Sequence, residues 1–197
     1  MTYKKNKKLI LASSSPRRRQ ILAEAGYQFD VIEPILDEPI YEKQKNNLSP
    51  EEFAQAIAYF KAMQIAEKNP ESIVIGADTI VVCNDRLIGK AKNANHAREI
   101  LNLLSRNRHR VITGIAIVNL EDNKRVIDYD ETWITMKPMS QSEIEKYIKS
   151  GQWQGKAGAY ALQQGGDKFV CKLEGSYSNV IGLPIELTSK LLKQFNF

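Results

Sequence analysis

The chain has 197 residues, 43% of them hydrophobic, which is enough to bury a substantial core in one domain or two closely joined lobes. Its formal net charge of +5 favours anionic partners, although charge alone does not choose among nucleic acid, membrane phosphate and a small phosphorylated substrate. The two cysteines, Cys83 and Cys171, lie far apart with no close Cys/His pair, which argues against a zinc cluster or a disulfide framework and favours buried apolar positions for both.

The N-terminal segment does not resemble a targeting signal. Its apolar run at residues 9–12 is too short for the core of a signal peptide, and no segment approaches the roughly 20 apolar residues of a membrane span. The four lysines within residues 1–8 are expected to form a solvated, fraying arm. We therefore expect a cytoplasmic protein without a membrane partner, in which residues 1–197 form a single domain.

Short apolar runs and helix-capping signals alternate through the first third of the chain. Ser15 can cap a helix whose first position is Pro16, because that position needs no backbone N–H, and Gly26 is a stop signal. Ser49 repeats this logic, with a glutamate three positions later. The predicted elements are a strand at 9–12, a helix from Ser15 to Gly26, a strand at 29–32 and a helix from Ser49 through Ile65.

The longest apolar stretch, residues 72–83, predicts a buried strand. A turn at 84–85 and a return strand at 86–89 make a hairpin plausible. With a two-residue turn, the register of this hairpin would set Lys90 opposite Thr79.

The second half of the chain continues the mixed pattern. Neither an internal repeat nor a low-complexity tract is visible, so we expect a mixed α/β fold. The predicted elements are a helix at 96–104, strands at 111–120 and 125–136, a helix opened by Ser140, further short strands within 151–182, and a helix that starts at Pro184.

A serine- and arginine-rich turn joins the first strand to the first helix, over residues 13–19. Cations in the first turn of a helix oppose the helix dipole, so an anion is expected to offset them. Backbone N–H groups, serine hydroxyls and guanidinium groups all donate to phosphate oxygens from such a position. Arg17 and Arg18 lie near the inward face of the helix and are the candidates for phosphate binding, whereas Arg19 is expected to face solvent.

Asp78 interrupts the apolar stretch 72–83. An unpaired carboxylate there would cost several kcal/mol, so it requires a cation, a metal or strong hydrogen-bond donors. A buried acid beside a cation can activate water, but a purely structural ion pair would explain Asp78 equally well.

Weaker signals lie elsewhere in the chain. Asp37 and Glu38 are paired acids that could hold Mg²⁺ while a triphosphate supplies the remaining oxygens. Lys61 and Lys156 could contact the phosphates. Taken singly, each of these side chains is more often a solvated surface charge.

Together these residues resemble the Maf family of nucleotide pyrophosphatases over residues 9–192. The motifs are short, but their order and spacing make the set specific. The matching segments are residues 11–18, 61–62, 76–79, 89–90, 156–160, and 175–177 leading to 182–184. The sequence departs from the family at Ala91, where proline is common, at Arg106, where a glycine is expected, and at Gly155, where an aspartate often precedes Lys156.

The resemblance implies an elongated mixed sheet flanked by helices, with two lobes around a deep nucleotide-binding cleft. It implies hydrolysis of dTTP, UTP and modified pyrimidine nucleotides to the monophosphate and pyrophosphate, with Mg²⁺ or Mn²⁺. It also implies a homodimer and an association with septum formation. The stretch 157–163 is similar to this branch of the family rather than to the branch that acts on 7-methyl-GTP.

The resemblance assigns roles to single residues. Asp78 falls on the family's proton acceptor, Glu38 falls on an acidic position linked to catalysis or metal, and these two are the candidate metal ligands. The candidate triphosphate-binding residues are Ser13, Arg17, Arg18, Lys61 and Lys90, together with Lys156. The candidate determinants of base choice are Arg17, Thr79 and Gln163.

Two other functions stay open at this point. The basic balance and the link to septum formation would fit a nucleic-acid-binding or division-regulating protein, but the basic residues are not gathered on one helix with interleaved aromatics, so no stable nucleic-acid partner is expected. A pyrophosphatase for purines such as dITP or XTP would share the reaction but not these motifs.

Overall fold

The computed structural model describes residues 7–35, 48–162 and 166–197, and these fall into two compact units. The first unit comprises Met1–Asp78, Thr113–Tyr129 and Gly182–Phe197, and the second comprises Thr79–Ile112 and Asp130–Ile181. In chain order the elements are β1 (Leu9–Ala12), α1 (Pro16–Glu24), β2 (Asp30–Ile32), α3 (Pro50–Ala66), β3 (Ile73–Cys83), β4 (Arg86–Ile88), α4 (Ala94–Leu104), β5 (Arg108–Asn119), β6 (Lys124–Met136), α5 (Gln141–Lys149), β7 (Val170–Glu174), α6 (Tyr177–Ile181) and α7 (Ile185–Leu192).

The strands form a seven-stranded sheet with the order β2-β1-β3-β5-β6-β7, and β4 pairs with β3 outside this path. The sheet is mixed, because β1 is parallel to β2 and β3, whereas β4 is antiparallel to β3 and β7 is antiparallel to β6. The predicted mixed α/β class is therefore confirmed.

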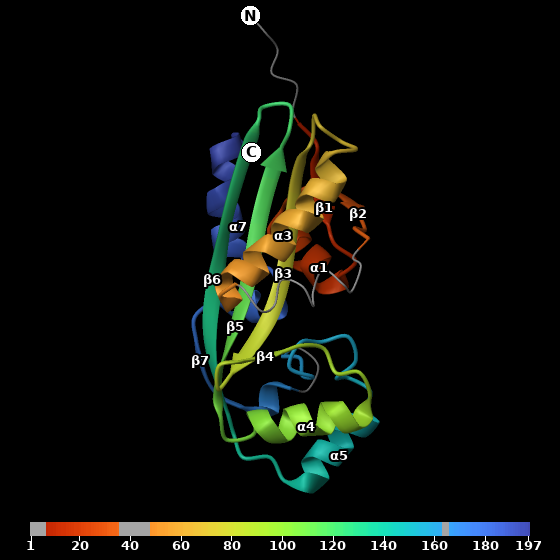
Figure 1. The fold of residues 1–197 in the computed structure, drawn as a ribbon, viewed down its shortest axis with the longest axis vertical. Coiled ribbons are helices and arrows are strands. Elements are labelled where there is room, and N and C mark those ends of the chain that lie inside the picture. Colours follow the sequence, from red (N-terminus) through yellow and green to blue (C-terminus); the bar gives the residue numbers. More distant parts are fainter. Residues whose placement is uncertain (1–6, 36–47, 163–165) are drawn as a thin grey trace, which may run out of the picture. The chain divides into compact units, whose positions relative to one another are not determined.

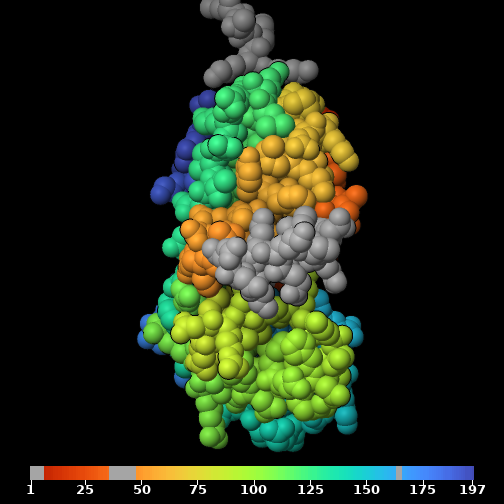
Figure 2. All heavy atoms as spheres, in the orientation of Figure 1, coloured from red at the N-terminus to blue at the C-terminus, as the bar shows by residue number. Residues whose placement is uncertain are grey.

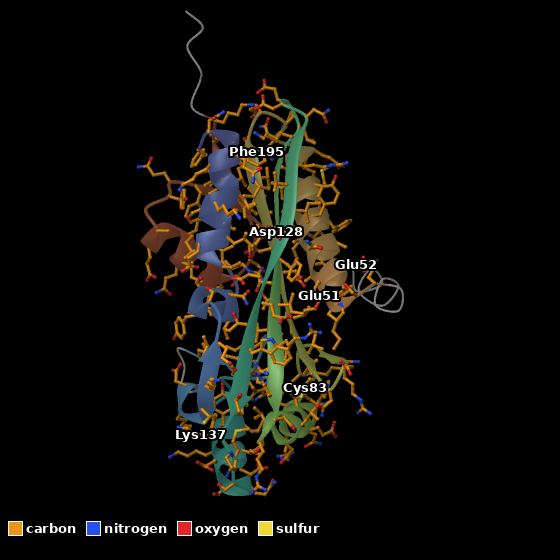
Figure 3. All side chains as sticks on the ribbon, turned by 90° about the vertical axis from the view of Figure 1, so that its left-hand side faces the viewer. Glu51, Glu52, Cys83, Asp128, Lys137 and Phe195 are labelled. Atoms are coloured by element: carbon orange, nitrogen blue, oxygen red, sulfur yellow. The ribbon has the colours of Figure 1, made fainter. Side chains whose placement is uncertain are left out.

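In the first unit, helices cover both faces of the sheet. Figures 1 and 3 show α3 on one face and α1 and α7 on the other. The predicted caps are confirmed: the Ser15 hydroxyl accepts from the backbone of Arg18, and Ser49 forms a capping box with Glu52. Glu51 and Glu52 are labelled in this first turn of α3 in Figure 3, where acidic side chains suit the positive end of the helix dipole.

Two glycines let α3 lie unusually close to the sheet. A Cβ atom at Gly76 would lie 2.1 Å from the carbonyl oxygen of Ala58, and one at Gly114 would lie 2.4 Å from the carbonyl oxygen of Ala54. No side chain fits at these distances, so both positions require glycine. The position of α3 over β3 is thereby fixed at Gly76.

The outer edge of β6 is paired over a short stretch. Within the described residues, β7 pairs with β6 from Trp133 to Met136, and Figure 3 shows the labelled Asp128 on the preceding part of the strand. The Asp128 side chain accepts from the N–H of Tyr129 at 2.9 Å, and the Asp130 side chain accepts from the N–H of Glu131 at 2.8 Å. Charged side chains along an edge strand are one way in which proteins limit pairing with other strands.

The second unit has its own apolar core, formed by β-strand residues together with α4 and α5. The β3–β4 hairpin has the predicted two-residue turn, with φ of 49° at Asn84 and 57° at Asp85. Its register pairs Val81 with Ile88 and Cys83 with Arg86, as the sequence predicted. Helix α4 begins two residues earlier than predicted because Asn93 caps it by accepting from a backbone N–H at 2.9 Å.

Three side chains differ from the sequence-based expectations or sharpen them. Cys83 is buried as predicted, but Cys171 is exposed because it lies on the outer strand β7. Lys7 is not part of a solvated arm: its ammonium group lies 2.9 Å from Glu121 and 2.8 Å from Asp122. These acids lie in the turn between β5 and β6, which Figure 2 shows at the surface of the first unit.

Arg106 stands where the family places a glycine. Its φ is 64°, so the backbone keeps the left-handed conformation that favours glycine.

None of the helices in the described part of the chain combines the length and apolarity that crossing a membrane requires.

Candidate functional site

The turn between β1 and α1 is held by its own serines. The Ser15 hydroxyl accepts from the N–H of Arg18 at 3.5 Å, and the buried Ser13 hydroxyl accepts from the N–H of Ser15 at 3.2 Å. These bonds satisfy orphan donors at the start of the helix. The backbone of the turn is therefore fixed, and with it the starting point of the Arg18 side chain.

The Arg18 guanidinium group points inward, as predicted, and two backbone carbonyls hold it. Its Nε donates to the carbonyl of Gly182 at 2.7 Å, and one terminal nitrogen donates to the carbonyl of Ala77 at 2.9 Å. The same nitrogen lies 3.4 Å from the hydroxyl of Ser13. Arg18 therefore ties the start of α1 to β3, next to Asp78.

Asp78 is paired with a cation, as its burial requires. The Lys61 ammonium group donates to Oδ1 of Asp78 at 2.6 Å and to the carbonyl of Ala77 at 3.3 Å. The side chains of Lys61 and Asp78 are only 9% and 6% exposed. This is a buried, hydrogen-bonded ion pair, which sequence reasoning anticipated without identifying Lys61 as the partner.

The close approach of α3 explains why these two residues meet. Gly76 and Asp78 are two residues apart on β3, so they lie on the same face of the strand. Ala58 and Lys61 are three residues apart on α3 and share one side of the helix. Because Gly76 lies against Ala58, Asp78 is brought to Lys61.

The carbonyl of Ala77 accepts from Arg18 and from Lys61. Two cations therefore meet at one oxygen atom, directly beside the carboxylate of Asp78. The arginine-rich turn and the buried acid therefore lie together in the first unit. A carboxylate flanked by two cations can accept a proton while the cations receive anionic oxygens.

The other two arginines of the turn differ in their exposure. Arg17 is half-buried and Arg19 is exposed, as predicted for Arg19. Neither Glu38 nor Gln163 lies within the described residues. In the part of the chain that the structure describes, His, Cys, Asp and Glu side chains do not form a group of three or more that could hold a metal ion.

The second unit contains Thr79, Lys90 and Lys156, and it brings the two lysine-bearing segments together. Lys90 was expected opposite Thr79, but the pairing of β3 with β4 ends at Ile88, and Lys90 instead forms an antiparallel bridge with Ala157. The ammonium group of Lys156 donates to the carbonyl of Gln152. The predicted hairpin register is confirmed over Val81–Cys83 and Arg86–Ile88. The pairing does not extend to Lys90, whose bridge partner is Ala157.

Sequence reasoning missed one buried polar contact near these lysines. Nε2 of His109, on β5, lies 2.8 Å from the hydroxyl of Tyr160. Burial lowers the pKa of His109 to about 4 and raises the pKa of Tyr160 above its ordinary value. His109 is therefore neutral at physiological pH. No sequence signal pointed to this contact, because His109 is a single histidine between Arg108 and Arg110. None pointed to the carbonyl of Gly182 as a partner of Arg18 either.

Comparison with known proteins gives a consistent result. The family described as "Maf-like protein" matches residues 8–195. A dTTP/UTP pyrophosphatase from Clostridioides difficile is 41% identical over 187 residues, which cover 95% of this chain and 94% of that protein. The dTTP/UTP pyrophosphatase of Elusimicrobium minutum is 42% identical over 96% of this chain and its own full length, and that of Thermoanaerobacter sp. is 44% identical over 95% of this chain and 96% of its own.

Proposed function

Because the chain belongs to the Maf family, which matches residues 8–195, we propose that it is a nucleoside triphosphate pyrophosphatase. Its substrates are dTTP and UTP, and the products are the nucleoside monophosphate and pyrophosphate. Relatives that carry this name are 41–44% identical to the chain over almost its entire length. Modified pyrimidine nucleotides extend the same substrate class.

The observation that carries this proposal is the meeting of Arg18 and Lys61 at the carbonyl of Ala77, beside Asp78. A structural ion pair needs one cation, whereas here a second cation, Arg18, donates to the carbonyl oxygen of Ala77 that Lys61 also contacts. Two donors beside one acid suit a triphosphate, whose oxygens gain charge as the reaction proceeds.

In the proposed reaction, the oxygen of a water molecule forms a bond to the α-phosphorus. The bond from that phosphorus to the bridging oxygen breaks, and pyrophosphate leaves with the electron pair. The carboxylate of Asp78 accepts the proton of the water. Arg18 and Lys61, with Arg17 and Ser13 nearby in the sequence, neutralise the charge on the phosphate oxygens.

A divalent cation, Mg²⁺ or Mn²⁺, belongs to the proposal. Hard cations of this kind are bound through one or two carboxylates while substrate phosphates supply further oxygens. The described residues of the site offer the carboxylate of Asp78, which fits that pattern, and Glu38 is the predicted second ligand. When bound, such an ion supplies charge stabilisation at the phosphate oxygens.

Several finer assignments rest on the family resemblance. They are the contact of Lys90 and Lys156 with the triphosphate, the choice of base by Arg17, Thr79 and Gln163, a nucleotide-binding cleft, a homodimer, a cytoplasmic location and a link to septum formation. A panel of dTTP, UTP, dITP and XTP with detection of pyrophosphate distinguishes the pyrimidine substrates from the purine alternative.

The test of the proposed function is Asp78→Asn. The variant keeps an oxygen that can accept from Lys61 but removes the counter-charge, so it should fold with reduced stability and bind nucleotide. Per folded molecule it should lose pyrophosphate release from dTTP and UTP, because an amide cannot accept the proton. Asp30→Asn makes the same chemical change at an exposed carboxylate of the first unit, and it should leave turnover unchanged. Unchanged turnover in Asp78→Asn would remove Asp78 from the reaction.

A further inference from the structure

Residues 156–162 form a strained turn in the second unit, called here the 156–162 turn. Gly158 and Ala159 have φ of 72° and 54°, so two successive residues adopt the left-handed conformation. Ala159 is an L-residue for which this conformation is unfavourable. Strain of this kind persists only where the surroundings fix the backbone, and it is concentrated at functional sites.

Two buried side chains from different elements fix the end of this turn. The Tyr160 hydroxyl lies 2.8 Å from Nε2 of His109, on β5, and the two rings meet edge to face with centroids 5.5 Å apart. The hydroxyl of Tyr147, on α5, accepts from the N–H of Ala161 at 3.1 Å. Consecutive residues of the turn are therefore tied to a strand and to a helix.

The beginning of the same turn carries Lys156 and is hydrogen-bonded to the segment that carries Lys90, the two lysines predicted to contact the triphosphate. Lys156 is its first residue, and the N–H of Ala159 donates back to the carbonyl of Lys156 at 3.1 Å. Ala157 forms the bridge with Lys90. The N–H of Gly158 donates to the carbonyl of Gly89 at 3.2 Å, so backbone hydrogen bonds join both lysine segments to the turn.

Apolar packing alone would not require a histidine opposite Tyr160. His109 is 1% exposed, and its Nδ1 has no hydrogen-bond partner among the described residues. A pair of apolar side chains could fill the same volume without leaving a buried nitrogen unsatisfied. What the polar pair adds is direction, because a hydrogen bond fixes where the tyrosine hydroxyl lies and apolar contact does not.

We propose that His109 and Tyr160 are positioning residues that hold the 156–162 turn, and with it Lys90 and Lys156, in the geometry that meets the triphosphate. This inference rests on the proposed function for the role of the two lysines. Neither His109 nor Tyr160 contacts the substrate. Their effect on the reaction passes through the backbone of the turn.

The first test does not depend on turnover. Tyr160→Phe removes the hydroxyl and keeps the ring, so amide hydrogen exchange should accelerate at Gly158, Ala159 and Ala161 while the rest of the second unit stays protected. Ser105→Ala is the matched control, because it removes a 2.8 Å hydrogen bond to Met139 elsewhere in this unit. Exchange in the turn that is unchanged by Tyr160→Phe would overturn the proposal.

The second test is kinetic. Tyr160→Phe should lower kcat/KM for dTTP by about tenfold, with a larger fall in kcat than rise in KM, because misplaced cations lose most where charge grows. His109→Gln retains a polar partner for the hydroxyl and should recover most of the activity, whereas His109→Leu should not. In a Lys156→Ala background, Tyr160→Phe should have a much smaller effect, because both changes act on the same contact.

The outcomes separate this inference from the proposed function. A wild-type protein that releases no pyrophosphate from dTTP or UTP, yet shows the change in exchange, rejects the proposed substrates and supports the positioning of the turn. An active wild-type protein whose kcat/KM per folded molecule is unchanged by both Tyr160→Phe and His109→Leu overturns the positioning role. Should Tyr160→Phe fail to fold, the comparison of His109→Gln with His109→Leu decides.

Discussion

Removal of the Lys61 ammonium group should lower the free energy of unfolding more than removal of a charge at the protein surface does. Lys61→Met keeps a long side chain against the sheet but leaves Asp78 without its 2.6 Å partner. Because both side chains are less than a tenth exposed, water reaches the orphaned carboxylate poorly. Loss of one partner from a buried pair costs about 3–5 kcal/mol, a large part of the roughly 5–15 kcal/mol that stabilises a typical domain.

A second variant removes both charges of the ion pair. Asp78→Leu in the Lys61→Met background replaces the pair with apolar side chains, and such replacements are often neutral or stabilising. The double variant should therefore be more stable than Lys61→Met alone, by about 3–5 kcal/mol if the double replacement is neutral. Neither variant is expected to release pyrophosphate.

Urea denaturation of the wild type, Lys61→Met and the double variant measures these free energies of unfolding. Lys7→Met is the control, since Lys7 has two carboxylate partners but lies at the surface, where ion pairs contribute about 0–1 kcal/mol. A loss below about 1 kcal/mol in Lys61→Met would refute the reasoning. It would mean that Asp78 finds another cation or is hydrated in the folded protein.

Three further predictions concern other parts of the fold. The pKa of His109 is about 4 when folded and 6.5 when unfolded, so the unfolded chain gains a proton first and the free energy of unfolding should fall by about 3 kcal/mol from pH 6.5 to 4. Urea titrations should show this loss in the wild type and not in His109→Gln; equal slopes would contradict it. Gly76→Ala places a Cβ atom 2.1 Å from the carbonyl oxygen of Ala58 on α3, and it should lower the free energy of unfolding by at least about 1–3 kcal/mol. Gly89→Ala is the control, because its Cβ atom meets nothing within 4 Å and it should change the free energy of unfolding by less than about 0.5 kcal/mol. Replacement of both Asp128 and Asp130 by serine removes two negative charges from the edge of β6, so light scattering should reveal self-association that the wild type lacks. A variant that scatters like the wild type would show that the aspartates do not protect the edge.

Elements whose boundaries depend on a few neighbouring residues could be predicted from the sequence. The caps at Ser15, Ser49 and Ser140 are all present because each hydroxyl bonds to a backbone N–H three residues along the chain. The two-residue turn at 84–85 set the register of the β3–β4 hairpin, because the residues on either side of the turn pair with each other. The start of α4 was missed because Asn93 was not taken as its cap.

Features that depend on neighbours distant in sequence were predicted poorly. Helix α6 was not predicted within the Gly-rich segment, where further strands were expected. Cys171 was expected to be buried and is exposed, since burial depends on which strand lies outermost in the sheet. Lys7 was assigned to a mobile arm because its partners, Glu121 and Asp122, lie more than 100 residues away.

The sequence by itself determined that Asp78 needs a cation, a metal or strong hydrogen-bond donors, because a carboxylate within an apolar strand is costly wherever the strand packs. It also determined that Arg18 lies on the inward side of its helix, since helical spacing is a local property. The tertiary structure decided which cation serves Asp78 and where the guanidinium group of Arg18 is held. Lys61 comes from α3, and the carbonyl of Gly182 comes from a segment more than 160 residues after Arg18. The contact at Gly76 that sets α3 against β3 is also tertiary, because its atoms are distant in sequence and no local spacing of residues predicts it.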